Sequence, residues 1–207
     1  MKQRRDNWEE CYQNNHMPWD TGHNVTVLQT LTQQYLTPGL KLLEIGCGSG
    51  TEAINFAKLG FNVTAIDISQ SAIELAKKKA DQENVNIDFQ TVDLTQGLAQ
   101  FEKFDVIFDR ACFHTYTDNH SREKFAGIIS EILKTSGYWF DISGNSDHRD
   151  DAGEINASYP KLRLQDIAQA TEKYFQIIEV KLDTIVVHRE NYGDINGLAW
   201  LVIMSKR

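Results

Sequence analysis

The chain has 207 residues, of which 41% are hydrophobic and 24% charged, a balance typical of one globular domain with a substantial core. Its formal net charge of −8 argues against a nucleic-acid partner, because binding to a phosphate backbone rests on clustered Lys and Arg. The longest apolar run, LAWLVIM near the C-terminus, falls far short of the roughly 20 residues that a membrane helix needs.

The first part of the chain, residues 1–39, is expected to form one or two helices that cover the edge of a sheet. The run LKLLEIG at 40–46 is almost wholly apolar and ends at glycine, as expected of a strand buried on both faces. A helix over 51–60 follows and is closed by Gly60 at its C′ position. A second strand is predicted at 61–68.

The middle of the chain continues the alternation of helix and strand. A helix is predicted over 69–83, where Ser71 and Glu74 have the spacing of a capping box. Strands are predicted at 85–94 and from Phe104 onward, followed by a helix over 121–137 that ends at Gly137 and a fifth strand at 138–143. Strands separated by helices of this length predict right-handed crossovers and a parallel sheet.

The last third differs, because two β-rich runs follow the predicted helix around 164–175. The runs at 177–187 and 197–206 are separated only by residues 188–196, which leave no room for a crossover helix. We therefore expect an antiparallel pair that gives the sheet one reversed strand. The polar segment 143–160 is either a loop that contacts substrate or a solvated insertion.

The glycine turn after the first strand is the strongest functional signal. Gly46, Gly48 and Gly50 place backbone N–H groups and a helix N-terminus at the carboxyl edge of the sheet. The dinucleotide fingerprint G-x-G-x-x-G requires glycine where this chain has Thr51, and Glu44 would serve a pyrophosphate poorly. A ligand with an ammonium group and a sulfonium centre suits that carboxylate, which describes S-adenosylmethionine.

Two further carboxylates stand at the ends of successive strands. Asp67 ends the second strand, where a carboxylate can accept hydrogen bonds from both ribose hydroxyls. Asp93 ends the third strand, where it can hold an adenine amino group. Either residue alone also suits a helix cap or a turn, so the indication comes from their combination with the glycine turn.

The segments LLEIGCGSG, VTAIDIS, TVDL and FDVIFD together resemble class I S-adenosylmethionine-dependent methyltransferases over essentially the whole chain. This resemblance implies an α/β, Rossmann-like three-layer sandwich with strand order 3-2-1-4-5-7-6, the seventh strand being antiparallel. It also implies S-adenosylmethionine as cofactor and S-adenosylhomocysteine as product.

Two other stretches, NWEECYQNNHMPWDTG and FDVIFDRACFHTY, narrow the resemblance to the branch of thiopurine S-methyltransferase and the plant halide and thiol methyltransferases. It implies that Trp8 and Trp19 belong to an N-terminal cover over the cofactor. It also implies that Asp93 and Leu94 contact the adenine and that Arg110 lies beside the reacting centre. Cys112-Phe113-His114 departs from the small residues of the thiopurine enzymes, so thiopurines are not implied as substrate.

The predicted site combines residues inferred from the glycine turn and the strand ends with residues implied by the resemblance. The positions expected to contact the cofactor are Trp8, Trp19, Glu44, Gly46, Cys47, Gly48, Gly50, Asp67, Ile68, Asp93, Leu94, Asp109 and Arg110. Arg110 and His114 are the expected catalytic residues. No His, Cys or carboxylate group has the spacing of metal ligands, so no metal is expected.

The methyl acceptor is expected to be a small molecule, with a thiol or similar soft nucleophile favoured. If Arg110 faces the pocket, its charge would lower the pKa of an incoming thiol, and no general base would be needed. If Arg110 is structural, we expect a pair with Asp109 or Asp141. If the acceptor is a hydroxyl or an amine, His114 is the candidate base.

The three cysteines and two further histidines carry the remaining predictions. Cys47 is expected to pack within the glycine turn, and Cys112 points either into the core or toward the substrate. His16 and His23 flank the PWDTG segment and either contact the substrate or are plain loop residues. The three cysteines form no C-x-x-C pair and, with no apolar leader visible, indicate a cytoplasmic protein, expected as a monomer or weak dimer.

Two other functions remain open. A dinucleotide-dependent oxidoreductase is disfavoured by Thr51. A cofactor-binding protein without catalysis would be expected to show a broken glycine turn or to lack Asp67, and neither is seen.

Overall fold

The structure is a computed structural model that describes residues 2–22, 28, 31, 34–98, 101–147, 161–189 and 193–207. His23 and the greater part of the predicted polar loop, residues 148–160, lie outside the described residues. The helices are α1 (Lys2–Gln13), α3 (Thr51–Lys58), α4 (Gln70–Gln82), α5 (Asn119–Ile132) and α6 (Leu164–Thr171). The strands are β1 (Lys41–Ile45), β2 (Asn62–Asp67), β3 (Asp88–Thr91), β4 (Phe104–Arg110), β5 (Leu133–Gly144), β6 (Phe175–Arg189) and β7 (Gly193–Lys206).

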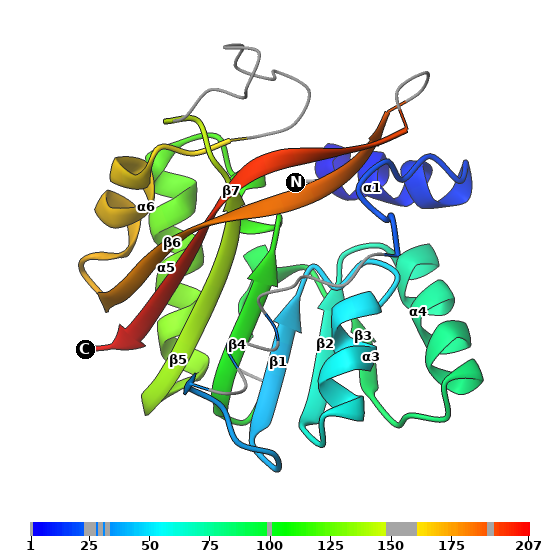
Figure 1. Cartoon of the computed structure of the whole chain (residues 1–207), viewed down its shortest axis with the longest axis horizontal. Helices are drawn as coiled ribbons and strands as arrows, with labels where there is room; N and C mark the ends of the chain where they lie inside the picture. The colour runs from blue at the N-terminus through cyan, green and yellow to red at the C-terminus, as the bar shows by residue number, and fades with distance from the viewer. Residues whose placement is uncertain are drawn as a thin grey trace.

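The strands of the described chain form one seven-stranded sheet in the order β3-β2-β1-β4-β5-β7-β6, which confirms the predicted order. Strands β1 to β5 pair in parallel, whereas β7 runs antiparallel to both β5 and β6. The predicted reversed strand is therefore β7. The α/β sandwich expected from the alternation of helix and strand is confirmed (Figure 1).

Helices cover both faces of the sheet and give it two hydrophobic layers. On one face, Ile54 and Phe56 of α3 and Ile73 and Ala76 of α4 pack against alternate residues of the strands. On the other face, buried residues of α5 and α6 pack against the strand residues that point to that side of the sheet. Residues 42–45 of β1 are buried throughout, as a central parallel strand requires.

Two predicted helix ends were placed wrongly. Helix α4 begins at Gln70, and its N-cap is Ser69, whose Oγ accepts a hydrogen bond from the Ala72 N–H at 3.0 Å. The predicted capping box at Ser71 is therefore wrong. Helix α5 ends at Ile132 and not at Gly137, because the chain becomes extended at Leu133, where pairing with β4 begins.

The hairpin of β6 and β7 is longer than predicted, because its pairing continues to Arg189 and Gly193. Helix α1, part of the predicted cover, lies above the carboxyl end of β2 and beside the upper end of α4 (Figure 1). Among the described residues, no helix is long and apolar enough to cross a membrane. Helix α1 therefore covers part of the carboxyl edge of the sheet.

Candidate active site

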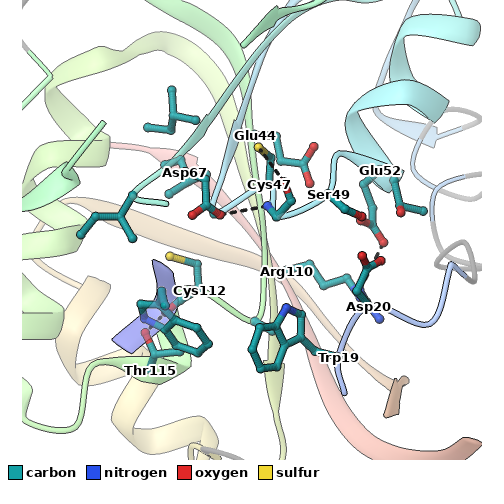
Figure 2. A pocket seen from close by; sticks show the side chains of 18 of the residues that line it. Trp19, Asp20, Glu44, Cys47, Ser49, Glu52, Asp67, Arg110, Cys112 and Thr115 are labelled. Carbon is teal, nitrogen blue, oxygen red and sulfur yellow. Dashed lines mark hydrogen bonds and ion pairs between the residues drawn. The ribbon is translucent and has the colours of Figure 1, made fainter. Parts of the chain in front are cut away.

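A cavity of about 380 Å³ lies between α1 and the carboxyl ends of β1, β2 and β4. The turn that follows β1 and Trp19 of the N-terminal cover lie on opposite sides of it (Figure 2), and β6 contributes Ile185 and Val187 to the wall. Eleven of the thirteen predicted cofactor residues line it: Trp8, Trp19, Glu44, Gly46, Cys47, Gly48, Asp67, Ile68, Asp93, Leu94 and Arg110. The sequence therefore located the cavity, although the roles of these residues remain proposals.

The two exceptions are Gly50 and Asp109. A Cβ at Gly50 would stand 2.9 Å from the Ala76 Cβ, so this glycine allows the start of α3 to pack against α4. Asp109 is fully buried and accepts hydrogen bonds from the N–H groups of Cys112 (2.9 Å) and Phe113 (3.2 Å). Asp109 therefore holds the turn after β4, and its predicted contact with the cofactor is not supported by this position.

Acidic side chains dominate the end of the cavity beside the glycine turn. Glu44 of β1 and Glu52 of α3 are 2% and 5% exposed. Burial raises the pKa of both, and each feels a charged neighbour: Glu52 raises the pKa of Glu44, while Arg110 lowers both. Within the described residues, Glu44 Oε2 and Glu52 Oε1 have no hydrogen-bond partner. This end of the cavity therefore favours a bound cation.

Arg110, at the end of β4, supplies the positive charge there. Its Nη1 lies 3.4 Å from Glu52 Oε1, and the two groups form an ion pair without a hydrogen bond. Figure 2 shows the side chain extending toward Glu52 and Asp20, with Trp19 nearby and Cys112 on the other side of the cavity. The structural alternative of a pair with Asp109 or Asp141 is thus replaced by a pair with Glu52.

Asp67 connects the glycine turn to the start of α4. Its carboxylate accepts hydrogen bonds from the N–H groups of Gly48 and Ser69, each at 2.9 Å. Burial raises its pKa, and these backbone hydrogen bonds oppose the rise. Each oxygen keeps a further lone pair, so a ligand hydroxyl can still be accepted.

Asp93 caps the short 3₁₀ turn at Leu94–Gln96. Its Oδ1 accepts hydrogen bonds from the Thr95 N–H at 2.9 Å and from the Thr95 Oγ1 at 2.6 Å. The carboxylate and Leu94 nevertheless line the cavity. The capping and binding interpretations of this aspartate are therefore compatible.

Three aromatic rings of the cover contact one another above the cavity. The ring centroids of Trp8 and Trp19 are 5.1 Å apart and edge-on, and Trp19 Nε1 donates to the Tyr12 hydroxyl at 3.3 Å. Burial, followed by the charge of Asp67, raises the pKa of Tyr12 well above its ordinary value. Tyr12 was not among the predicted site residues, although its position between the two tryptophans was a signal.

The cover is also tied to the rest of the protein through the segment after α1. The His188 N–H of β6 donates to the Pro18 carbonyl at 2.6 Å, and Lys79 of α4 lies 3.4 Å from Asp20. Ile185 and Val187 of β6 line the cavity, which no local pattern indicated. Their place depends on the hairpin reaching over the carboxyl ends of other strands.

The predicted histidines differ in position. His114 is buried in the cavity wall, where its Nδ1 accepts a hydrogen bond from the Gly144 N–H at 2.9 Å. Its ring proton is therefore on Nε2, and burial together with the charge of Arg110 lowers its pKa to about 3. This geometry argues against His114 as a general base. His16 is exposed and does not line the cavity.

The wall after β4 also contains Ala111 and Cys112, whereas Cys47 lies in the glycine turn after β1. Ala111 has a φ of 63°, an uncommon conformation for a residue with a side chain, and it lines the cavity. Cys112 lines the cavity rather than lying in the core, and it packs directly against Gly46. Burial raises the pKa of Cys47 well above its usual range, which indicates a packing role. Among the described residues, no cluster has the composition of a metal site.

Comparisons with known proteins place this cavity in a family context. Residues 42–137 match the family model of a methyltransferase domain. The ribosomal protein L11 methyltransferase of Dictyoglomus turgidum is 33% identical over 131 residues, which are 62% of this chain and 41% of that protein. The chain spans less than half the length of the curated relatives that it matches.

Two solved structures share the fold over most of the chain. A structure from a study of the conversion of a disulfide bond into a thioacetal group during echinomycin biosynthesis has a TM-score of 0.78 and 22% identity, covering 91% of this chain and 84% of that one. Magnesium protoporphyrin IX methyltransferase from Synechocystis with bound SAM has a TM-score of 0.73 and 16% identity, covering 100% and 96%. At these identities the likeness is one of fold.

Proposed function

We propose that this chain, which carries a methyltransferase domain at residues 42–137, is an S-adenosylmethionine-dependent methyltransferase that acts on a small molecule. The observation that carries the proposal is the pair of buried carboxylates at the glycine turn: Glu44 Oε2 has no hydrogen-bond partner among the described residues, and neither has Glu52 Oε1, which is held by the 3.4 Å ion pair with Arg110. A ligand ammonium group would supply the missing hydrogen bonds, and a sulfonium charge nearby would be stabilised by the same field.

The remaining cavity residues fit the other parts of the cofactor. The methionine carboxylate suits Arg110, whose Nε is buried without a hydrogen-bond partner among the described residues. The ribose hydroxyls suit Asp67, and the adenine suits the edge formed by Ile68, Asp93 and Leu94. A diphosphate would instead face the carboxylates of Glu44 and Glu52, which disfavours a dinucleotide.

The aromatic cover would exclude water from the cofactor. Trp8, Tyr12 and Trp19 line the cavity. Exclusion of water strengthens electrostatic interactions around a cationic centre, and aromatic faces attract cations directly. The cover would therefore contribute to both binding and alignment.

The favoured acceptor is a thiol or a similar soft nucleophile. Bound S-adenosylmethionine would supply an electrophilic methyl group, and the chain would need only to align an acceptor that is already partly ionised. A thiol of pKa about 8.5 is a few per cent thiolate at neutral pH, and the charge of Arg110 would increase that fraction. The acceptor nitrogen of His114 is already used by the Gly144 N–H and its pKa is lowered to about 3, so the site fits a thiol better than a hydroxyl or amine acceptor that needs a base.

Two experiments test the proposal at separate levels. Calorimetric titration should give binding of S-adenosylhomocysteine and no binding of NAD; the reverse result would overturn the cofactor. A donor-coupled assay over thiols, halides, tellurite, catechols and small amines should give turnover with thiols. Turnover with catechols or amines alone would retain the enzyme class and reject the thiol acceptor.

A further inference from the structure

One carboxylate of the N-terminal cover contacts the start of a helix on the sheet side of the cavity. Glu9 of α1 accepts hydrogen bonds from Ser69 Oγ (2.7 Å), Ser71 Oγ (2.5 Å) and the Ser71 N–H (3.2 Å). Both oxygens of the carboxylate are used, and Gln13 of the same helix donates to Oε1 at 2.9 Å. Figure 1 shows α1 lying beside the upper end of α4, where these serines stand.

Glu9 lies between two residues of α1 that line the cavity. Trp8 precedes it and Tyr12 lies one turn later, and both line the cavity. Ser69 follows Asp67 and Ile68, which line the cavity from the opposite side. The carboxylate therefore joins the roof of the cavity to the β2–α4 turn, at the place proposed to hold the ribose.

A charged carboxylate is well suited to this position. The first N–H groups of a helix have no partner within the helix, and the N-terminus favours negative charge. Three of the four donors to Glu9 come from the start of α4, so an amide, with one acceptor oxygen in place of two, replaces the carboxylate poorly. A glutamine would direct its NH₂ group at donors and would lose the charge.

We propose that Glu9 is a latch: a positioning residue that holds Trp8 and Tyr12 over the cavity and must release Ser69 and Ser71 before the cofactor exchanges. The proposal rests on the proposed function for the identity of the exchanging molecule. It needs no movement of the sheet, because the contacts that break are those between the Glu9 side chain and residues at the start of α4. Loss of the latch opens the cover and shortens the residence time of the bound molecule.

The test compares Glu9→Gln and Ser71→Ala with Glu10→Gln, which removes the same charge from an exposed neighbour on the same helix. Dissociation of S-adenosylhomocysteine is followed by stopped-flow tryptophan fluorescence. Hydrogen exchange of the α1 amides is measured without ligand. We expect Glu9→Gln to accelerate dissociation about tenfold or more, because it disrupts several charge-assisted hydrogen bonds, and to accelerate α1 exchange while exchange in β1 and β4 is unchanged.

Ser71→Ala should change both rates in the same direction, and Glu10→Gln should leave both within about twofold of the wild type. In the double variant, Ser71→Ala should add little to Glu9→Gln, since the shared contact is already lost. Unchanged dissociation and α1 exchange in Glu9→Gln would overturn the latch, as would equal acceleration throughout the core. If wild type fails to bind S-adenosylhomocysteine, the proposed function fails, while α1 exchange still decides whether Glu9 holds the cover.

Discussion

The hydroxyl of Tyr12 lies 2.5 Å from the point where a Cβ on Gly48 would stand. The N-terminal cover thus closes directly onto the backbone of the glycine turn, and only a residue without a side chain leaves room for it. Gly48 also has a φ of 53° and donates its N–H to Asp67. This relationship explains both the need for glycine and the enclosure of the cavity.

Gly48→Ala should therefore displace Tyr12 and weaken the closed cover. The added methyl group meets the flexible end of a side chain, so the first response is movement of α1, together with about 1 kcal/mol of backbone strain. We expect S-adenosylhomocysteine affinity to fall and α1 exchange to rise. In a background with Tyr12→Phe, which removes the clashing hydroxyl, Gly48→Ala should cost less. An equal loss in both backgrounds would mean that the clash is not the cause.

Asp67→Asn should weaken cofactor binding while the fold is retained. The N–H groups of Gly48 and Ser69 donate to different oxygens of Asp67, so the single amide oxygen can accept from only one of them, and the charge and the second acceptor are lost. We expect a loss of about 1–3 kcal/mol in the binding of S-adenosylhomocysteine by calorimetry. Asp88→Asn, at an exposed position of β3, is the matched control. Unchanged affinity would mean that the ribose is held elsewhere.

Arg110→Met should reduce methyl transfer most for poorly acidic thiols. Its charge favours the thiolate, so its loss matters least where the thiol is already ionised. Rates measured over thiols of different pKa provide the test, and an equal loss across the series would remove the electrostatic role. The exposed Arg163, which pairs with Asp166 away from the cavity, gives the control Arg163→Met.

The same substitution predicts a change in stability. Without Arg110, Glu52 is left as a buried carboxylate without its counter-charge, and the free energy of unfolding should fall by about 3 kcal/mol. Adding Glu52→Gln should recover part of this loss, because the uncompensated charge is removed. Chemical denaturation of the single and double variants measures both values, and strictly additive losses would contradict the pairing.

His114→Asn should retain turnover within about threefold, whereas loss of a general base costs about 10²–10⁴-fold. Asparagine can still accept the Gly144 N–H, so the wall of the cavity is preserved. The pKa of His114 is about 3 in the folded protein and 6.5 ordinarily, so its burial costs no stability above about pH 6.5, where the imidazole is neutral in both states. As the pH falls from 6.5 toward 3, the unfolded chain takes up a proton that the folded protein does not, and the free energy of unfolding decreases. The variant should lack this component of the pH dependence of unfolding. A hundredfold loss of turnover would instead support His114 as a general base.

The latch should fail at low pH. Burial by itself raises the pKa of Glu9, but hydrogen bonds from Ser71 and Ser69 outweigh it and lower the pKa from 4.5 to about 2. A lowered pKa means that the contact stabilises the closed cover fully above about pH 4.5 and is lost as pH falls through about 2. Exchange of α1 amides should rise over this window in the wild type. In Glu9→Gln the rise should be absent, with Asp67 as the nearby carboxyl common to both proteins.

The local patterns of the sequence determined most of the fold. The apolar run 40–46, the alternation of helix and strand and the short connection at 188–196 were sufficient for a parallel sheet with one reversed strand, whereas the strand order and the choice of the seventh strand came from the resemblance to class I methyltransferases. Element ends were less accurate, because pairing with β4 sets the start of β5 at Leu133 and not the glycine at 137. Ser69 and Ser71 are both plausible caps, and only the geometry of α4 distinguishes them.

Part of the candidate site also follows from the sequence, and part follows only from the tertiary structure. Strand ends bring Glu44, Asp67, Asp93 and Arg110 to one edge of a parallel sheet whatever the details of packing, so the sequence by itself determined where the cavity lies and that it is acidic. Only the tertiary structure decided that Glu9 accepts hydrogen bonds from the serines at the start of α4 and that Ile185 and Val187 enter the wall. It also decided that Arg110 pairs with Glu52 and that His114 accepts from Gly144. These contacts join segments 30 to more than 100 residues apart, and their geometry depends on packing of the whole domain, which no local period of the chain encodes.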